Sequence, residues 1–226
     1  HLLERLSKRS NLNIAALYKS KILNSNYEFL RPIYADLLNP NSLKGWLSNK
    51  GTVVNLAYMW NAGEKVNMLA ASNLIDACIC MGVHRLIHIS TAAVVGRARS
   101  HNVDESTPCN PYTEYARTKF KIEEFLRTRA LNSGIDLVIL RPTSVFGPAG
   151  VPLQKLCIDL KRGHWIQNYL RTCLFAERAM NLIHVDNVVE AICHMIDYPS
   201  CLNGRTFIVA DDEDPLNNFS YVEEVI

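Results

Sequence analysis

Short apolar runs alternate along the chain with longer segments in which apolar residues recur at helical spacing. The apolar runs predict strands over residues 13–17, 29–35, 52–57, 86–90 and 136–140. Helical spacing predicts helices over 1–10, 67–81 and 112–132, with a short helix around 43–47. In the helix 67–81 we expect Leu69, Leu74, Ile75 and Cys78 to form the buried stripe.

The order of these elements predicts the fold class. Strands that alternate with helices form parallel sheets through right-handed crossovers, with helices on both faces. The predicted strands are continuous apolar runs, as in sheets that are buried on both faces. We therefore expect an α/β fold with a doubly wound parallel sheet, Rossmann-like, that binds ligands at the carboxyl ends of its strands. Ala57, Thr91 and Arg141 lie at such ends.

The alternation becomes less regular after Gly150. We expect a helix over 152–163, a strand over 181–185, a helix with Asp186 as its N-cap, a strand over 206–209 and a helix from residue 221. The pattern predicts a doubly wound α/β domain over residues 1–150. Residues 151–226 are predicted to form part of a smaller lobe over the sheet edge.

Composition narrows the choice of partners and compartment. The 226 residues carry a formal net charge of +2, which favours neither nucleic acid nor an anionic membrane as a partner. Apolar runs are too short to span a membrane, so we expect no membrane segment. Seven scattered cysteines predict reduced, buried thiols and a cytoplasmic protein. The spacing Cys78-Ile79-Cys80 is not that of a zinc site, and we predict no metal site.

Tyr115 and Lys119 are the first candidates for chemistry. On a helix, residues four apart share a face, so an ammonium lies one turn from a phenol. That ammonium favours the phenolate and lowers the pKa of the phenol from its usual value near 10. The pair suits proton exchange with a hydroxyl or a carbonyl, although the same spacing also occurs by chance in helices.

Two hydroxyls end the strand that precedes this helix. Ser90 and Thr91 follow the apolar run 86–89 and come before a loop of small residues. A hydroxyl at this point can bond the substrate oxygen that Tyr115 protonates. The alternative is a strand-end hydroxyl that bonds only to backbone groups.

Seven ordered segments make the interpretation specific. They are ADLLNP (35–40), VVNLAY (53–58), the helix 67–77, STAAVVG (90–96), YARTK (115–119), LRPTSVFGPAG (140–150) and NLIHVDNVVEAI (181–192). In this order the chain resembles the extended short-chain dehydrogenase/reductase family, whose members include NAD-dependent epimerases and dehydratases of nucleotide sugars. The resemblance implies an NAD(P)-dependent enzyme, with its NAD(P)-binding domain over residues 1–150 and part of its substrate-binding lobe over residues 151–226.

The resemblance also implies roles for individual residues. Tyr115 would be the acid/base, Lys119 would lower its pKa and hold the nicotinamide ribose, and Thr91 would supply the catalytic hydroxyl. Asp36 and the backbone of Leu37 would meet the adenine. The full set implied for the cofactor is Lys19, Asp36, Leu37, Ala57, Tyr58, Ser90, Tyr115, Lys119, Pro142 and Val145. The set implied for the substrate is Thr91, Thr143, Ser144 and Arg178.

Several positions depart from the family pattern. The first strand and its glycine-rich phosphate loop are expected just before His1, and further residues are expected after residue 226. Ser144 stands where many sugar-nucleotide epimerases carry an asparagine. Met180 stands where they carry an arginine, for which Arg178 is a possible substitute.

The choice between NAD and NADP depends on the end of the strand 13–17. NAD-preferring members carry an acidic residue there that binds the ribose diol. This chain has Lys19 and Lys21 instead, and a lysine can neutralise a 2′-phosphate. The alternative for the two lysines is an ordinary solvated loop. The cofactor is therefore NAD or NADP, with NADP slightly favoured.

Three functions remain open. The first is epimerisation, reduction or dehydration of a nucleotide-activated sugar, although Ala92 and Ala93, directly after Thr91, argue against dehydration. The second is reduction or dehydrogenation of another carbonyl or alcohol, such as a steroid-like or phenolic compound. The third is a non-catalytic dinucleotide-binding protein, which the Tyr115–Lys119 pair argues against.

The resemblance further implies a homodimer formed through the helices 67–81 and 112–132.

Overall fold

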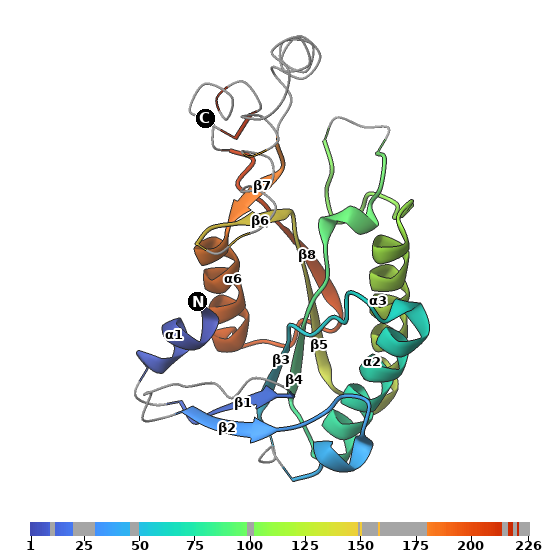
Figure 1. Ribbon diagram of the computed structural model, residues 1–226, viewed down its shortest axis with the longest axis vertical. Helices are drawn as coiled ribbons and strands as arrows, with labels where there is room; N and C mark the ends of the chain where they lie inside the picture. The colour runs from blue at the N-terminus through green and yellow to red at the C-terminus, as the bar shows by residue number, and fades with distance from the viewer. Residues whose placement is uncertain are drawn as a thin grey trace.

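The computed structural model of the chain describes residues 1–9, 12–19, 30–45, 50–98, 102–148, 150, 158, 180–213, 217, 218 and 221 (Figure 1). Arg178, Lys21 and the helix predicted over 152–163 lie outside the described residues, apart from position 158. The predicted division at residue 150 therefore stays a prediction.

Eight strands and four longer helices form the described part of the chain. The strands are β1 (Ile14–Tyr18), β2 (Leu30–Tyr34), β3 (Thr52–Asn55), β4 (Arg85–Ile89), β5 (Asp136–Pro142), β6 (Ser144–Phe146), β7 (Leu182–His184) and β8 (Arg205–Val209). The helices are α1 (Leu2–Ser7), α2 (Gly63–Cys80), α3 (Glu114–Ser133) and α6 (Val185–Asp197), with 3-10 turns η1 (Pro40–Leu43) and η2 (Ala92–Val94).

All strand pairs in the described residues are parallel. The main sheet has the order β3-β4-β5-β8, while β1 pairs with β2 and β6 pairs with β7 in separate sheets. The sheet of β1 and β2 is separate from the main sheet, and the gap lies between β1 and β3. In a doubly wound sheet the first strand occupies this position. The α/β class with parallel pairing is confirmed, and the described residues form it in separate sheets.

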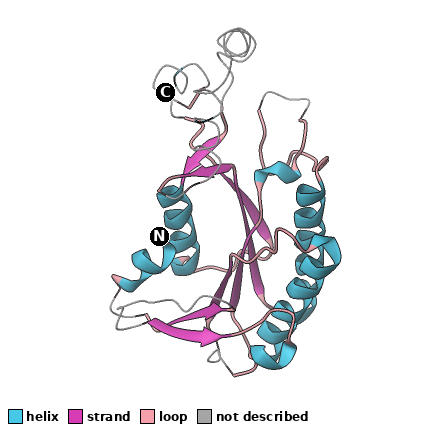
Figure 2. Cartoon of the chain, in the orientation of Figure 1, coloured by secondary structure: helices cyan, strands magenta, loops and turns pink. Residues whose placement is uncertain are grey.

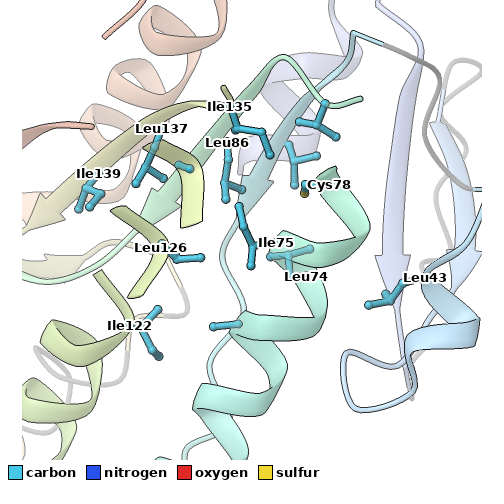
Figure 3. Packing of buried hydrophobic residues seen from close by; sticks show 14 of the residues in the cluster. Leu43, Leu74, Ile75, Cys78, Leu86, Ile122, Leu126, Ile135, Leu137 and Ile139 are labelled. Carbon is cyan, nitrogen blue, oxygen red and sulfur yellow. The ribbon is translucent and has the colours of Figure 1, made fainter. Parts of the chain in front are cut away.

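Helices cover both faces of the main sheet. Figure 1 shows α6 and α1 on one side of it and α2 and α3 on the other, and Figure 2 shows the same arrangement by element type. Alternate residues of each strand serve the two faces. Leu86 and Leu137 pack in a core with α2 and α3, while Ile87 and Val138 pack in a second core with α6. Figure 3 shows the first core, in which Ile75 and Leu126 are fully buried.

Several local expectations were wrong. Leu69 is 51% exposed, although Leu74, Ile75 and Cys78 are buried as predicted. Near the helix expected around 43–47 the structure has a 3-10 turn over Pro40–Leu43, and positions 46 and 47 lie outside the described residues. Strand β6 was not expected, because three residues are too few to show a period.

Asp186 is not an N-cap. Helix α6 begins at Val185, directly after β7, so the capping position falls on His184. The His184 imidazole Nδ1 accepts a hydrogen bond from the backbone N–H of Asp186 at 3.3 Å. Asp186 instead places its negative charge in the first turn, where the helix dipole favours it.

The cysteines follow the expectation in part. Among the described residues, Cys78 and Cys193 are buried free thiols and Cys109 is half-buried. Cys80 and Cys201 are exposed, so the prediction of buried thiols is wrong for them. Cys80 lies two positions after Cys78 and so faces away from the core, and Cys201 lies in the loop before β8.

A buried ion pair closes the amino-terminal edge of the main sheet. Arg85 Nε donates to Asp136 Oδ2 at 2.7 Å, and both side chains are almost fully buried. The remaining Arg85 nitrogens donate to the carbonyls of Met195, Tyr198 and Ser200. The pair therefore ties the end of α6 and the loop after it to the first residues of β4 and β5.

Within the described residues, no helix is long and apolar enough to cross a membrane.

Candidate active site

The hydroxyls predicted at the end of β4 lie at the carboxyl edge of the main sheet. The Ser90 N–H donates to Leu140 O at 2.7 Å, which extends the β4–β5 ladder by one bond. The Ser90 side chain is buried, and its hydroxyl has no partner among the described residues. Thr91 caps η2, since its Oγ1 accepts from the Ala93 N–H at 3.3 Å. Thr91 thus bonds a backbone group, as in the alternative interpretation of a strand-end hydroxyl.

Helix α3 presents Tyr115 and Lys119 to this edge. Thr113 is its N-cap and accepts from the Ala116 N–H at 3.1 Å. The cap starts the helix at Glu114, so Tyr115 lies in its first turn and Lys119 one turn later. The long side chain of Lys119 reaches back to β4, where Nζ donates to Ile89 O at 2.9 Å.

Lys119 is a buried ammonium. Its side chain is 4% exposed, and burial lowers its pKa to about 8, with the carboxylate of Glu123 opposing the shift. Glu123 is itself buried and forms a two-pronged pair with Arg141 of β5, at 3.1 and 2.6 Å. The Lys119 charge therefore stands one turn from a carboxylate that a second cation already neutralises.

The pKa of Tyr115 departs from its usual value in the direction opposite to the prediction. Burial raises the pKa of this phenol, and the Thr91 hydroxyl opposes the shift. Lys119 does not direct its ammonium at the phenol oxygen: Nζ bonds Ile89 O and lies 5.0 Å from the centre of the Tyr58 ring. The Tyr115 phenol is thus protonated at neutral pH in this arrangement.

Three aromatic rings meet at this point. The Tyr58 ring contacts the Tyr115 ring edge-on at 5.0 Å between centres, and the Trp60 ring stacks on Tyr115 at 4.7 Å with an angle of 19°. Trp60 is 72% exposed, so one face of its ring is open to solvent. Sequence reasoning placed Tyr58 here and missed Trp60. The signal available was two aromatic residues directly after a strand end.

A polar pair beneath the rings fixes the loop that carries them. Asn55 Oδ1 accepts from the Ala57 N–H at 3.1 Å, and its Nδ2 lies 3.1 Å from His88 Nδ1. Burial lowers the pKa of His88 to about 3, with Lys119 adding to the shift, so the imidazole is neutral and Nδ1 accepts the bond. Asn67 holds the same loop through Met59 N, at 2.9 Å, and Met59 O, at 3.0 Å. These contacts position Ala57 and Tyr58.

A small pocket opens beside this pair. Its lining residues are Leu37, Asn55, Ala57, Tyr58, Met59, Asn67, Ala70, Ala71, His88 and Ile122. The structure thus brings together Leu37, Ala57 and Tyr58, three of the residues that the resemblance assigns to the cofactor. It also adds Asn55 and His88, which sequence reasoning missed.

Lys19 and Asp36 meet at the ends of β1 and β2. Lys19 Nζ lies 2.8 Å from Asp36 Oδ2, and the ammonium lowers the pKa of that carboxyl. The backbone N–H of Leu38 donates to Asp36 Oδ1 at 3.0 Å. The sequence assigned these two side chains to different parts of the cofactor and did not foresee their contact. They come together because β1 and β2 are parallel neighbours.

The segment after β5 carries the remaining predicted residues. Pro142 ends β5, and the Thr143 N–H donates to Val209 O at 3.0 Å. Ser144 and Val145 belong to β6, which pairs with β7; Ser144 is exposed and Val145 packs against the α6 core. Arg178 lies outside the described residues. Thr143 and Ser144 therefore follow β5 at the same sheet edge as Thr91.

The residues at this edge fit a nicotinamide dinucleotide. The ends of β1 to β5 carry a cation, a carboxylate, small residues and hydroxyls in an order suited to one extended ligand. The Ser90 hydroxyl has no partner among the described residues and the Lys119 ammonium has donors to spare, so both groups can bind further polar atoms.

The fold and this edge define the class of protein, and sequence comparison places the chain within it. A model of the NAD dependent epimerase/dehydratase family matches residues 1–210. The chain belongs to this family. The resemblance drawn from the motifs is confirmed.

Three relatives show the range of the family around this chain. It is 32% identical over 161 residues to a UDP-glucose 4-epimerase of Vibrio cholerae, covering 67% of this chain and 45% of that protein. It is 40% identical over 87 residues to a 3beta-hydroxysteroid-dehydrogenase/decarboxylase of Arabidopsis thaliana, covering 37% and 20%. The structure of a UDP-glucuronic acid 4-epimerase from Bacillus cereus with NAD matches with a TM-score of 0.70 and 20% identity, covering 93% and 73%. The chain thus spans less than half the length of these two sequence relatives.

The buried Lys119 generates a prediction for stability against pH. Because its folded pKa of about 8 lies below the ordinary 10.5, the unfolded chain binds the proton more tightly. The contribution of Lys119 to stability is therefore lowest below pH 8 and rises between pH 8 and 10.5, by about 1.4 kcal/mol per unit. The free energy of unfolding of the wild type should gain about 2–3 kcal/mol over Lys119→Met between pH 7 and 10.

Urea unfolding at four pH values measures this difference, in the full-length protein. Lys121→Met is the matched control, since Lys121 is exposed and pairs with Glu64 at the surface. A wild-type minus Lys119→Met difference that stays constant over this range contradicts the assignment.

Proposed function

We propose that this chain carries the active site of an NAD(P)-dependent oxidoreductase or epimerase that acts on a nucleotide-activated sugar. The observation that carries the proposal is the position of Tyr115 and Lys119 around the Tyr58 ring at the end of β4, where Thr91 caps η2. Family membership supports the cofactor, and the Vibrio cholerae epimerase supports the substrate class.

The nicotinamide ring, when bound, supplies hydride transfer to and from a substrate carbon. The chain's own residues then handle the proton. Tyr115 is the acid that donates its phenolic proton to the carbonyl oxygen formed at that carbon, and the base that removes it in the reverse direction. Thr91 bonds the same oxygen and orients it. Burial favours the protonated phenol, which suits the reductive direction.

Lys119 has two roles in this proposal. Its ammonium lies among backbone and ring groups, where it can bond a ribose hydroxyl and stabilise the Tyr115 phenolate by charge. Glu123 favours the protonated form of that ammonium near neutral pH, because its carboxylate opposes the effect of burial on the Lys119 pKa. Loss of Lys119 therefore affects both cofactor binding and proton transfer.

Substrate contacts come from the segment after β5. Thr143 and the exposed Ser144 face the same edge, and Arg178 stays a candidate for the pyrophosphate. Ala92 and Ala93 form η2 directly after Thr91 and carry no acid or base. This favours epimerisation or reduction over dehydration, which calls for a further acid/base pair.

Replacement of Tyr115 by phenylalanine tests the mechanism. In the full-length protein, assayed on a panel of UDP- and dTDP-sugars with NAD and NADP, Tyr115→Phe should lower kcat by roughly 10²–10⁴-fold. The Kd of the cofactor should stay nearly unchanged. Tyr112→Phe is the matched control, since Tyr112 is an exposed tyrosine just before α3. Near-normal turnover by Tyr115→Phe removes Tyr115 from the mechanism.

We infer a slight preference for NADP. Lys19 is the charged group at the end of β1, and it is half-exposed beside Asp36. In NADP, the 2′-phosphate on the adenosine ribose would replace Asp36 as the partner of the Lys19 ammonium, and this phosphate carries more negative charge than a carboxylate. The Asp36 carboxylate competes for the same ammonium, so the preference is small.

Cofactor titrations with Lys19→Ala decide the point. The variant should lose affinity for NADPH by about threefold to tenfold and bind NADH as before, because a half-exposed ion pair contributes about 1 kcal/mol. Kd values from nicotinamide fluorescence give the comparison, with a Lys8→Ala variant, changed at the residue directly after α1, as the control. A tenfold preference of the wild type for NADH would falsify the inference.

The aromatic face favours one other substrate class. Trp60 and Tyr58 offer an apolar surface next to Tyr115, and such a surface also suits a steroid-like or phenolic ring. The Arabidopsis thaliana relative, a 3beta-hydroxysteroid-dehydrogenase/decarboxylase, supports this alternative over a shorter segment. Reduction or dehydrogenation of such a ring is our second candidate function.

Trp60→Ala distinguishes the two candidates. If the substrate carries an apolar ring that stacks on Trp60, Trp60→Ala should raise KM by about tenfold or more. The KM of Trp60→Phe should stay close to that of the wild type. For a nucleotide sugar held through its phosphates, the change in KM should stay within about threefold. Steady-state kinetics on both panels measures KM and kcat. Turnover of sugars alone, with unchanged KM, eliminates the second candidate.

The proposed homodimer concerns α2 and α3. These helices pack together on one face of the main sheet and leave Leu69 and Leu131 exposed, at 51% and 85%. Pairing with a second copy would cover such residues. Both the dimer and the cytoplasmic location stay predictions.

A further inference from the structure

We propose that His84, Asp136 and Cys201 form a binding site for one zinc ion, at the edge of the main sheet opposite to Tyr115. One ligand atom of each residue lies within 4.8 Å of the other two. Nitrogen, carboxylate oxygen and thiolate sulfur are the ligands that zinc takes in proteins, at about 2.0–2.3 Å. The sequence did not indicate this site, because the three residues are far apart in the chain.

The backbone around each ligand residue is held in place. The His84 N–H donates to Gly51 O at 3.0 Å, and His84 O accepts from the Asp136 N–H at 3.0 Å. On either side of Cys201, Ser200 O accepts from Arg85 at 2.8 Å and the Leu202 N–H donates to Asp136 Oδ1 at 2.7 Å. The site is therefore largely formed before an ion arrives, and this lowers the cost of binding.

Asp136 keeps room for an ion in its hydrogen-bond set. A carboxylate has about four acceptor sites. Three are used: Oδ1 accepts from Leu202 N and Asn203 N, and Oδ2 accepts from Arg85 Nε at 2.7 Å. One acceptor site remains for a metal. Arg85 balances the buried carboxylate without an ion, so the metal is an addition to the fold and not a condition for it.

His84 and Cys201 are exposed, while Asp136 is buried. An ion can therefore enter from solvent, and water completes its coordination as the fourth ligand. Zinc holds neighbouring ligands about 3.3–3.8 Å apart in a tetrahedral arrangement, so the two exposed side chains need only small movements. A soft thiolate with an imidazole excludes magnesium and calcium, which prefer oxygen ligands.

The position of the site defines its role. His84 precedes β4 and Thr91 follows it, which puts the two about 20 Å apart along the strand. The ion is therefore too far from Tyr115 to touch a substrate there. It joins the start of β4 and β5 to the loop before β8, and it stabilises the native state in proportion to how strongly it binds.

Cobalt serves as the probe, because a Co²⁺–thiolate bond gives a charge-transfer band in the near ultraviolet. The full-length protein, reduced and free of any affinity tag, is titrated with Co²⁺ and then with Zn²⁺. We expect a charge-transfer band that saturates at one ion and is displaced by Zn²⁺. Cys201→Ser should abolish the band, and His84→Ala should weaken Co²⁺ binding by at least tenfold.

Two matched variants complete the test. Cys80→Ser and His194→Ala remove an exposed thiol and an exposed imidazole elsewhere, and both should bind Co²⁺ like the wild type. Far-ultraviolet circular dichroism of each variant establishes that it is folded, and the exposure of Cys201 and His84 favours this. The proposal is overturned if the wild type shows no charge-transfer band. It is also overturned if the band survives in folded Cys201→Ser or is lost equally in Cys80→Ser.

Discussion

The parallel register of β3, β4 and β5 is the constraint on which the site depends. Backbone hydrogen bonds in a buried parallel ladder leave no freedom to slide, because a shift by one residue exchanges the two faces of the strand. Leu86 and Ile87 would then change places between the two cores. The register therefore fixes Ala57, Thr91 and Thr143 at one edge, and the amino-terminal edge is fixed with it.

A second constraint is the handling of buried charge around α3. Lys119, Glu123 and Arg141 carry a net charge of +1 in a region almost closed to water. The pair of Glu123 with Arg141 satisfies both partners with two hydrogen bonds and leaves Lys119 with one bond to Ile89 O. An ammonium in this position has spare donors, which is a costly arrangement in a core and a useful one next to a ligand.

Sequence reasoning predicted the class of fold and the edge of the sheet at which the site lies. The apolar runs and the Tyr115–Lys119 spacing carry that information locally. It could not foresee contacts between elements that are distant in the chain, such as Lys19 with Asp36 or Trp60 with Tyr115. The expected lowering of the Tyr115 pKa was wrong because spacing on a helix says neither how deeply the phenol is buried nor where the ammonium points. The cap of α6 was misplaced because a histidine took a role that sequence rules give to aspartate.

The exposed ring of Trp60 has an optical consequence. Indole emission overlaps the absorption of a reduced nicotinamide, and energy passes between such groups when they lie close together. A tryptophan stacked on Tyr115 at 4.7 Å therefore stands within reach of any reduced dinucleotide at this edge. The protein thus carries its own fluorescent reporter, and its emission should respond to the redox state of the cofactor without a label.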